Sequence, residues 1–149
     1  MDLPDLQGFV SPSSSEAAWV YAEIFEDRVY TPPGIRTWPG MNVVDVGGGL
    51  GLFTIFMRNV CHANFITLIE PSKDSFELCV RNVTTALGGR NDGLLFHECA
   101  CGAADGESDL IFFPGLPSNS CLGEFEALKR QHIGEEGAFN AGLVEYLTP

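Results

Sequence analysis

The sequence has few basic residues and no long apolar run. Eight Lys and Arg stand against 20 Asp and Glu in 149 residues, so the formal net charge is -12 and the pI is near 4.4. Such an acidic balance disfavours non-specific binding to nucleic acid or to anionic membranes. No stretch of eighteen apolar residues is present, which argues against a membrane-spanning helix. We therefore expect neither nucleic acid nor a membrane as a partner.

The chain also lacks a recognisable cysteine framework. Its five cysteines are an odd number, and Cys99-Ala-Cys101 does not have the two-residue spacing of common zinc pairs. The start MDLPDLQGFV has neither the basic region nor the apolar core of a secretory signal. We expect a cytoplasmic protein with buried free thiols and no metal site.

What is present is an alternation of apolar strands and helices. With 45% hydrophobic residues, a chain of this length can bury one core and form one domain. A Ser/Pro cluster predicts a capped helix that starts near Ser15. Predicted strands then alternate with predicted helices: strand Val43–Val46, helix from about Gly51 to Val60, strand Asn64–Ile69, helix from Ser72 to about Leu87, and strand Gly93–Cys99. This order predicts an α/β fold, a Rossmann-like sheet of parallel strands with helices on both faces.

The alternation stops after Gly102. The stretch Ser108–Phe113 predicts one more strand, LPSNSCLGEF is expected to be a loop, and EFEALKRQHI predicts a short helix. Three parallel strands and one appended strand are few for this class of fold. We therefore expect the sheet to be incomplete.

The segment VVDVGGGLGLF carries the first functional signal. Four glycines follow an apolar strand directly, and such a turn lets the backbone approach a ligand and offers free helix N–H groups. Gly47-x-Gly49-x-x-Leu52 lacks the last glycine of the dinucleotide pattern. Asp45, just before the turn, would repel a pyrophosphate and attract an ammonium group. The alternative is an ordinary strand-to-helix loop that is rich in glycine.

Glu70 carries the second signal. It ends the second predicted strand, nineteen residues beyond Gly51, close to the spacing of about twenty expected for an acidic residue that binds a ribose. Its carboxylate could accept hydrogen bonds from both ribose hydroxyls. Alternatively, Glu70 is an exposed residue that stabilises the start of the next helix. A ligand with a ribose, an ammonium group and no phosphate is S-adenosylmethionine.

These residues resemble a known family. DVGGGLG, with IE after the second strand, looks like the class I methyltransferases. EIFEDRVYTPPGIRTWPGMNVVDVGGGLGLFTIF, IEPSKDSFELCVRNV, CGAADGESDL and SNSCL together resemble the FkbM family of S-adenosylmethionine-dependent methyltransferases, over roughly Glu16 to Leu122. One departure is Gly48-Gly49, where the family often has Ala-Asn; the extra freedom should cost some loop order and leave the fit intact.

The resemblance implies a class I Rossmann-like fold and transfer of a methyl group, mostly to oxygen, on a small-molecule or glycan-type hydroxyl. It assigns Asp45, Gly47, Gly49 and Gly51 to the cofactor loop and Glu70 to the ribose. We expect residues 1–41 to form an N-terminal helix and connection, 42–123 the cofactor-binding core, and 124–149 an aperiodic tail or truncated continuation.

The methyl acceptor and the catalytic base cannot be assigned. The histidines His62, His97 and His132 are candidates by pKa, but none lies in a motif, and each is expected to be structural. No counterpart of the family's acceptor side follows Leu122, so we expect little activity from this chain alone and a tendency to self-associate. Two other interpretations stay open: a non-catalytic remnant or interaction protein on this fold and, less favoured, half of a nicotinamide-dependent oxidoreductase.

Overall fold

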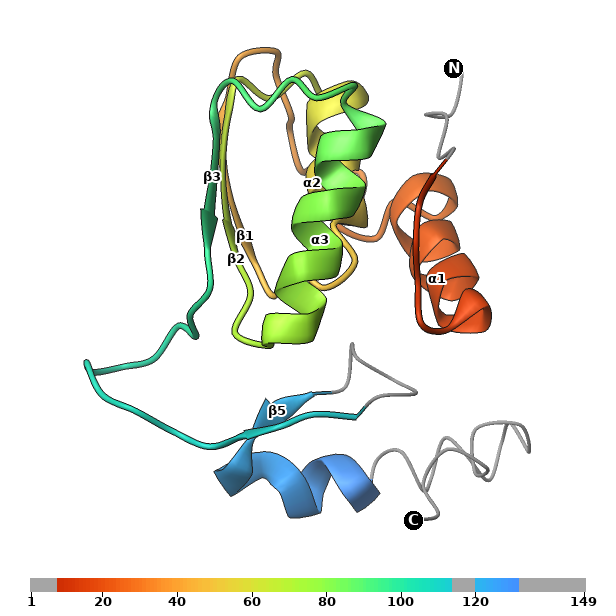
Figure 1. The fold of residues 1–149 in the computed structure, drawn as a ribbon. Coiled ribbons are helices and arrows are strands. Elements are labelled where there is room, and N and C mark those ends of the chain that lie inside the picture. Colours follow the sequence, from red (N-terminus) through yellow and green to blue (C-terminus); the bar gives the residue numbers. More distant parts are fainter. Residues whose placement is uncertain (1–7, 114–119, 132–149) are drawn as a thin grey trace. The chain divides into compact units, whose positions relative to one another are not determined.

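The computed structural model describes residues 8–113 and 120–131 (Figure 1). Contacts divide the chain into two compact units, Met1–Gly102 and Ala103–Pro149. The expected division into residues 1–41, 42–123 and 124–149 stays a prediction.

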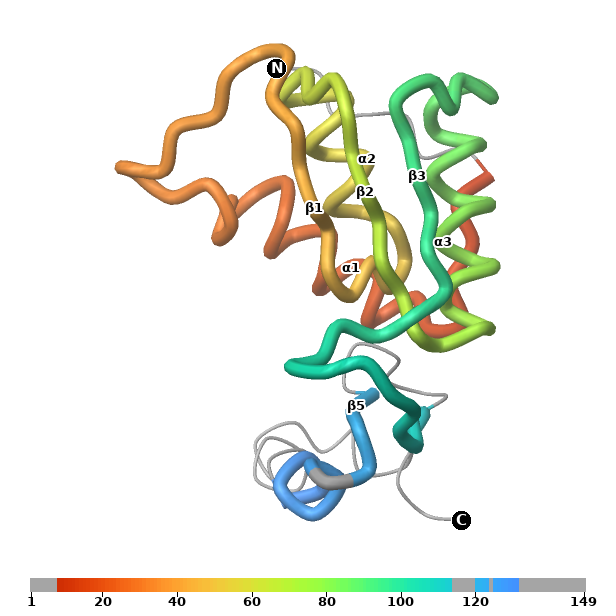
Figure 2. Tube along the Cα trace, turned by 90° about the vertical axis from the view of Figure 1, so that its left-hand side faces the viewer, coloured from red at the N-terminus to blue at the C-terminus, as the bar shows by residue number. Residues whose placement is uncertain are grey.

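The first unit is built on a parallel sheet of three strands. These are β1 (Asn42–Val46), β2 (Phe65–Ile69) and β3 (Leu94–His97), in the order β1-β2-β3 (Figure 2). Both strand pairs are parallel, so the carboxyl ends of all three strands lie at the same edge of the sheet. The α/β class and the parallel strands are thereby confirmed.

Helices precede and connect the strands. They are α1 (Ser14–Tyr21), a π-helical turn η1 (Ala22–Glu26), α2 (Leu52–Asn59) and α3 (Lys73–Ala86). Both helices that were expected to start at a serine are capped by one: the Ser13 side chain, in the Ser/Pro cluster, accepts from the Glu16 N–H, and the Ser72 side chain accepts from the Ser75 N–H. Each cap satisfies one of the backbone donors that a helix start leaves unpaired.

The helices of the first unit lie on one face of the sheet (Figures 1 and 2). The core forms between them and the strands, where Ile66 and Leu68 of β2 and Ile55 and Phe56 of α2 are at most 2% exposed. Phe25 of η1 meets the Phe56 ring edge-on, with the ring centroids 5.3 Å apart. This layer follows from alternation along the strands, which sends every second side chain toward the helices.

The opposite face of the sheet is uncovered in the described residues. Val44 and Val46 of β1 are 63% and 60% exposed, and Leu95 of β3 is 47% exposed. Val44 pairs with Thr67, which pairs with Leu95, so one row of this face crosses all three strands. The expectation of helices on both faces is therefore not met within these residues. The near-continuous apolar strands, which suggested cover on both sides, leave apolar side chains exposed instead.

The second unit contains a short antiparallel pair. β4 (Leu110–Ile111) pairs with β5 (Cys121–Leu122), and a 3-10 turn η3 (Gly123–Phe125) leads into a helix over residues 126–131. The strand predicted over Ser108–Phe113 exists but is shorter, and it was wrong to append it to the parallel sheet. The expected loop LPSNSCLGEF was wrong at Cys121–Leu122, because Leu110 and Ile111 supply these two residues with backbone partners. The predicted short helix is confirmed.

The cysteines are only partly as expected. Cys61 and Cys79 are buried, but Cys99 and Cys101 are exposed, so burial was a wrong expectation for that pair. Within residues 8–113 and 120–131, no group of three or more His, Cys, Asp or Glu side chains is placed to hold a metal ion. Nor does any helix of these ranges have the length and apolar character needed to cross a membrane.

We predict that the chain self-associates through the uncovered sheet face, because pairing two copies there removes apolar side chains from water. Replacing Val44 and Leu95 together by Thr, which keeps strand propensity, should lower the association measured by sedimentation across a concentration series. Ile35→Thr is the matched control, since Ile35 is 59% exposed but lies in a connection. Association that persists unchanged in the double variant would contradict this interpretation.

Candidate functional site

The glycine turn joins β1 to α2 at the carboxyl edge of the sheet. Gly47, Gly49 and Gly51 have φ values of 82°, 51° and 82°, a region that side chains rarely adopt. Gly51 caps α2 without a side-chain hydrogen bond. The turn thus needs glycine at these three positions for its backbone path alone.

The four glycines face two different environments. A Cβ at Gly48 would lie 2.5 Å from the Leu68 side chain, and a Cβ at Gly51 would lie 2.6 Å from Val83. At Gly47 a Cβ would meet nothing within 4 Å, and at Gly49 it would come no closer than 3.8 Å to a backbone oxygen. Gly48 and Gly51 therefore pack against the protein, and Gly47 and Gly49 line the open side. Gly48 was expected only to add backbone freedom. The structure gives it a packing role as well, because an alanine there would require Leu68, only 1% exposed, to move.

The N–H groups of the turn are largely engaged. The carbonyl of Ile69 accepts from the N–H groups of Gly47 at 2.8 Å and Gly48 at 3.1 Å, and the Gly51 N–H donates to the Gly48 carbonyl at 2.7 Å. The Gly49 N–H donates to a carboxylate oxygen of Glu70. These four N–H groups are therefore not free, contrary to the expectation for the turn: Ile69 and Glu70, at the end of β2, accept from three of them, and the Gly48 carbonyl accepts from the fourth. The open side of the turn therefore offers a ligand space, and few free backbone N–H donors.

Glu70 joins the turn to the next helix. One carboxylate oxygen accepts from the Gly49 N–H at 2.9 Å, and the other accepts from the Ser72 N–H at 2.9 Å, at the cap of α3. Glu70 is only 7% exposed, so the alternative prediction of an exposed residue at the start of the helix was wrong about its exposure. Because each ionised carboxylate oxygen can accept two hydrogen bonds, both retain acceptor capacity.

Asp45 points from β1 toward the helical layer. Its carboxylate accepts a 2.6 Å hydrogen bond from the Thr54 hydroxyl, within the first turns of α2, and is 5% exposed. A hydrogen bond from the Thr54 backbone N–H also favours the ionised form of Asp45, so this carboxylate caps a helix whose own cap residue, Gly51, has no side chain. Burial, and to a smaller extent the charge of Glu70, raises the pKa of Asp45, while the hydrogen bond with Thr54 opposes that rise.

Several acidic groups create a negative field around the turn. Asp45 and Glu70 are close enough that the charge of Glu70 raises the pKa of Asp45. Burial and the charge and hydrogen bond of Glu23 raise the pKa of the Tyr30 phenol, with a further contribution from Asp45. The Tyr30 ring itself lies beside Phe53 of α2, with centroids 5.2 Å apart. Such a field favours a cation and opposes a phosphate.

Three residues that support the site were missed at the level of sequence. Thr54 holds Asp45, the Cys79 thiol lies 3.8 Å from the Gly48 carbonyl, and the Asn82 amide donates to the Leu50 carbonyl at 3.0 Å. All three are fully buried. A usable signal existed for Thr54 and Asn82, because each is a polar residue among the apolar positions of an amphipathic helix.

The histidines gain no catalytic arrangement. His62 is exposed in a turn with φ of 57°, and its carbonyl accepts from the Gly40 N–H. His97 is exposed at the end of β3, and His132 lies outside the described residues. The expectation that they are structural stays a prediction.

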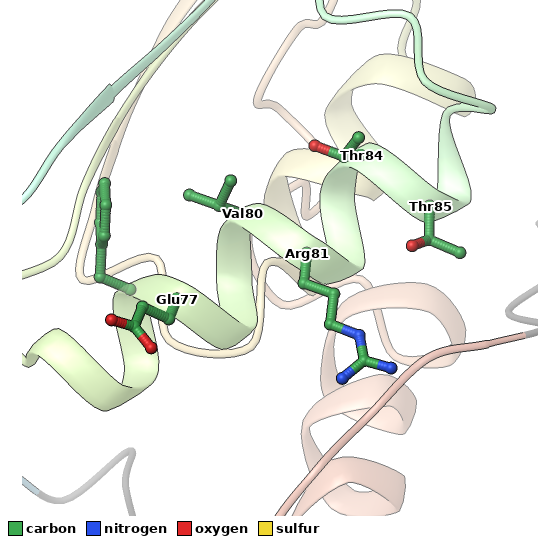
Figure 3. Close-up of a pocket in the computed structure, with 6 residues that line it drawn as sticks. Glu77, Val80, Arg81, Thr84 and Thr85 are labelled. Atoms are coloured by element: carbon green, nitrogen blue, oxygen red, sulfur yellow. The ribbon is translucent and has the colours of Figure 1, made fainter.

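A depression of about 440 Å³ lies elsewhere on the first unit, along the outer side of α3 (Figure 3). Its lining consists of Phe76, Glu77, Val80, Arg81, Thr84 and Thr85. None of the sequence-predicted site residues lines it. The glycine turn is therefore a separate feature.

Sequence comparison finds similarity to proteins named methyltransferases. No family model matches the chain. Over 149 residues it is 30% identical to the 31-O-demethyl-FK506 methyltransferase FkbM of Streptomyces tacrolimicus, a match that spans 97% of this chain and 55% of that protein. The similarity covers almost all of this chain but little more than half of that protein.

Two fungal proteins give the same result. Methyltransferase sdnD of Sordaria araneosa is 30% identical over 118 residues, 79% of this chain and 44% of that protein. Methyltransferase 1 of Beauveria bassiana is 29% identical over 120 residues, 79% of this chain and 46% of that protein. The chain thus spans about half the length of these relatives. A solved structure of MtNAS in complex with MTA and tNA has a TM-score of 0.38, with 24% identity over 54% of this chain and 28% of that one.

We predict that Gly51→Ala destabilises the chain more than Gly47→Ala. Both glycines have φ of 82°, so alanine is strained at both positions, by about 1–2 kcal/mol. Only at Gly51 does the new methyl group overlap Val83, and overpacking costs about 1–3 kcal/mol more. Urea denaturation of both variants measures the difference. Equal losses of stability would show that Gly51 is not packed as described.

We also predict that Asp45→Asn stabilises the fold by about 0.5–2 kcal/mol at neutral pH, because it removes a buried charge and keeps an acceptor for Thr54. The pKa of Asp45 is higher folded than unfolded, so the folded state takes up the proton first as the pH falls. The cost of the charge, fully present above that raised pKa, is therefore lost in acid, and the advantage of the variant should shrink there. Unfolding curves from neutral to acid pH test this, with the exposed Asp92→Asn as control. A destabilised Asp45→Asn variant at neutral pH would contradict it.

Proposed function

We propose that the chain binds S-adenosylmethionine and forms the cofactor-binding half of an O-methyltransferase that acts on a small-molecule or glycan-type hydroxyl. One observation carries the proposal: two carboxylates, Asp45 and Glu70, flank a glycine turn whose outer side has room for a ligand. The homology to proteins named methyltransferases supports the reaction.

The residues present fit the cofactor. The missing Cβ atoms of Gly47 and Gly49 leave open space beside the turn, and the remaining acceptor capacity of Glu70 suits two ribose hydroxyls. Asp45 lies beneath the turn and adds negative charge for a ligand that carries a sulfonium and an ammonium group. Because Asp45 is only 5% exposed, its contribution is chiefly electrostatic.

In this function the residues of the chain bind S-adenosylmethionine and orient it. S-adenosylmethionine supplies an electrophilic methyl group for attack by an acceptor oxygen. Glu70 holds the ribose while it keeps the Gly49 N–H and the start of α3 in place. The turn lets the ligand approach the backbone, and the buried Thr54 hydroxyl holds Asp45 in position. An in-line transfer depends on such positioning, since reacting atoms must be about 3–3.5 Å apart. We assign no catalytic base.

A non-catalytic binding or interaction protein on the same fold is the second candidate. It is favoured by the uncovered face of the sheet, where Val44 and Val46 are exposed. Half of a nicotinamide-dependent oxidoreductase is less favoured, because Asp45 and Glu70 would oppose a pyrophosphate at the turn. Labelled methyl transfer to a pool of hydroxylated acceptors separates an enzyme from a binding protein.

We predict that S-adenosylmethionine binds more tightly than the oxidised or reduced nicotinamide dinucleotide, and that Glu70→Gln weakens its binding at least about tenfold. The amide group of Gln would face either the Gly49 or the Ser72 N–H with a donor, and the charge is lost. Charge-assisted hydrogen bonds are worth about 1.5–3 kcal/mol each. Calorimetric titration measures all three ligands. Glu77→Gln, an exposed change on α3, is the control that should bind like the parent.

Two outcomes would overturn the proposed ligand. One is a dinucleotide affinity equal to or higher than that for S-adenosylmethionine. The other is a folded Glu70→Gln variant that binds S-adenosylmethionine as tightly as the parent does.

A further inference from the structure

Asn82 is a buried amide that joins three distant parts of the first unit. Its side-chain nitrogen donates to the Leu50 carbonyl in the glycine turn at 3.0 Å and to the Val10 carbonyl at 2.9 Å. Its side-chain oxygen accepts from the Val10 N–H at 2.8 Å. The residue is 0% exposed. Both donors of the amide are therefore used, and one acceptor position is occupied as well.

The contact with Leu50 is one of a set on the protein side of the turn. Residues on the inner side of α3 meet successive parts of the turn: Cys79 lies against the Gly48 carbonyl, and Val83 lies where a Cβ of Gly51 would be. Asn82, between them, supplies a directional hydrogen bond. The open side of the turn thus depends on a rear surface built by α3.

The contacts with Val10 attach the start of the described chain to this same amide. Val10 gives both its N–H and its carbonyl to Asn82, which is a two-point contact. Immediately before Val10 in the chain, Phe9 packs against the core, and a Cβ at Gly8 would lie 3.1 Å from Thr85. Residues 8–10 are therefore docked on the first unit by a polar and an apolar contact.

Because one side-chain nitrogen serves both Leu50 and Val10, the two contacts are linked. If residues 8–10 leave, the amide loses two of its three hydrogen bonds and is free to rotate. An amide that rotates no longer fixes the Leu50 carbonyl. Undocking of residues 8–10 should therefore loosen the turn, and loosening of the turn should weaken the docking of residues 8–10.

We propose that Asn82 is a positioning residue that fixes the rear of the glycine turn and makes the conformation of the turn depend on the docking of residues 8–10. Its consequence for S-adenosylmethionine rests on the proposed function. Its consequence for the turn itself does not, and it can be measured without any ligand.

Amide hydrogen exchange in the ligand-free chain tests the effect on the turn. Asn82→Asp keeps the size of the side chain but, when ionised, has no donor for Leu50 or Val10. Phe9→Ala leaves the amide intact and loosens the segment, because it removes the half-buried ring that packs residue 9 against the core. Both variants should speed the exchange of the Gly49 and Gly51 amides at least about tenfold more than that of the Ile66 amide in β2.

Leu87→Ala is the matched control. Leu87 is 4% exposed at the end of α3, so the variant loses stability through a cavity. It should speed the Gly51 and Ile66 amides by similar factors. Turn-selective exchange that appears in Phe9→Ala and Asn82→Asp but not in Leu87→Ala supports the proposal. Turn exchange that follows Ile66 in every variant, or that is unchanged in Phe9→Ala, overturns it.

Titration with S-adenosylmethionine then tests the effect on binding. Because the Leu50 carbonyl is no longer held, Asn82→Asp should raise the Kd at least about fivefold, and Phe9→Ala should raise it in the same direction. Leu87→Ala, compared while folded, should stay within about twofold of the parent. A parent that binds no S-adenosylmethionine refutes the proposed function, and the exchange measurements still decide the positioning of the turn.

Discussion

The hydrogen bond between the Gly49 N–H and the Glu70 carboxylate is the contact on which the site depends. It joins the connection after β1 to the end of β2, and the second oxygen of the same carboxylate extends the link to the Ser72 N–H at the start of α3. One side chain thereby fixes three chain segments that parallel pairing has already brought to a common edge. A buried carboxylate with two backbone donors is stabilised where it lies, and its remaining lone pairs can still accept.

The packing behind the turn explains why its glycines are not equivalent. Gly48 and Gly51 make room for Leu68 and Val83, while Gly47 and Gly49 leave room on the opposite side. Asp45 and Thr54 add a cap for α2 that its own glycine cap cannot provide. Helix capping, core packing and negative charge thus converge within a few residues, so that structural and binding demands fall on the same side chains.

The sequence allowed much of this to be predicted. Parallel strands and their helices are apparent from the alternation of apolar segments, and the Ser/Pro cluster before Ala17 and Ser72 mark helix starts by their chemistry. Asp45, the glycines and Glu70 could be placed near one another because parallel strands share one carboxyl edge. Local patterns of this kind depend on neighbours in the chain, which the sequence shows directly.

Contacts between distant residues could not be predicted. The pairing of Asn82 with Val10 spans 72 positions and leaves no local pattern, and the bond between Gly49 and Glu70 depends on strand register. The uncovered face was missed because apolar residues at Val44 and Leu95 look the same whether or not a helix covers them. Strand register and the covering of a sheet face depend on tertiary structure, which no local sequence pattern records.

The central claim is that the open side of the glycine turn, next to Glu70, receives S-adenosylmethionine. Nuclear magnetic resonance of the backbone amides during titration with this ligand tests it most directly. The largest shifts should fall on Gly47, Gly49 and the amides of residues 70–72, with the Gly49 amide reporting any change in its bond to Glu70. Shifts confined to other parts of the chain, or shifts of the same size and place with a nicotinamide dinucleotide, would contradict the claim.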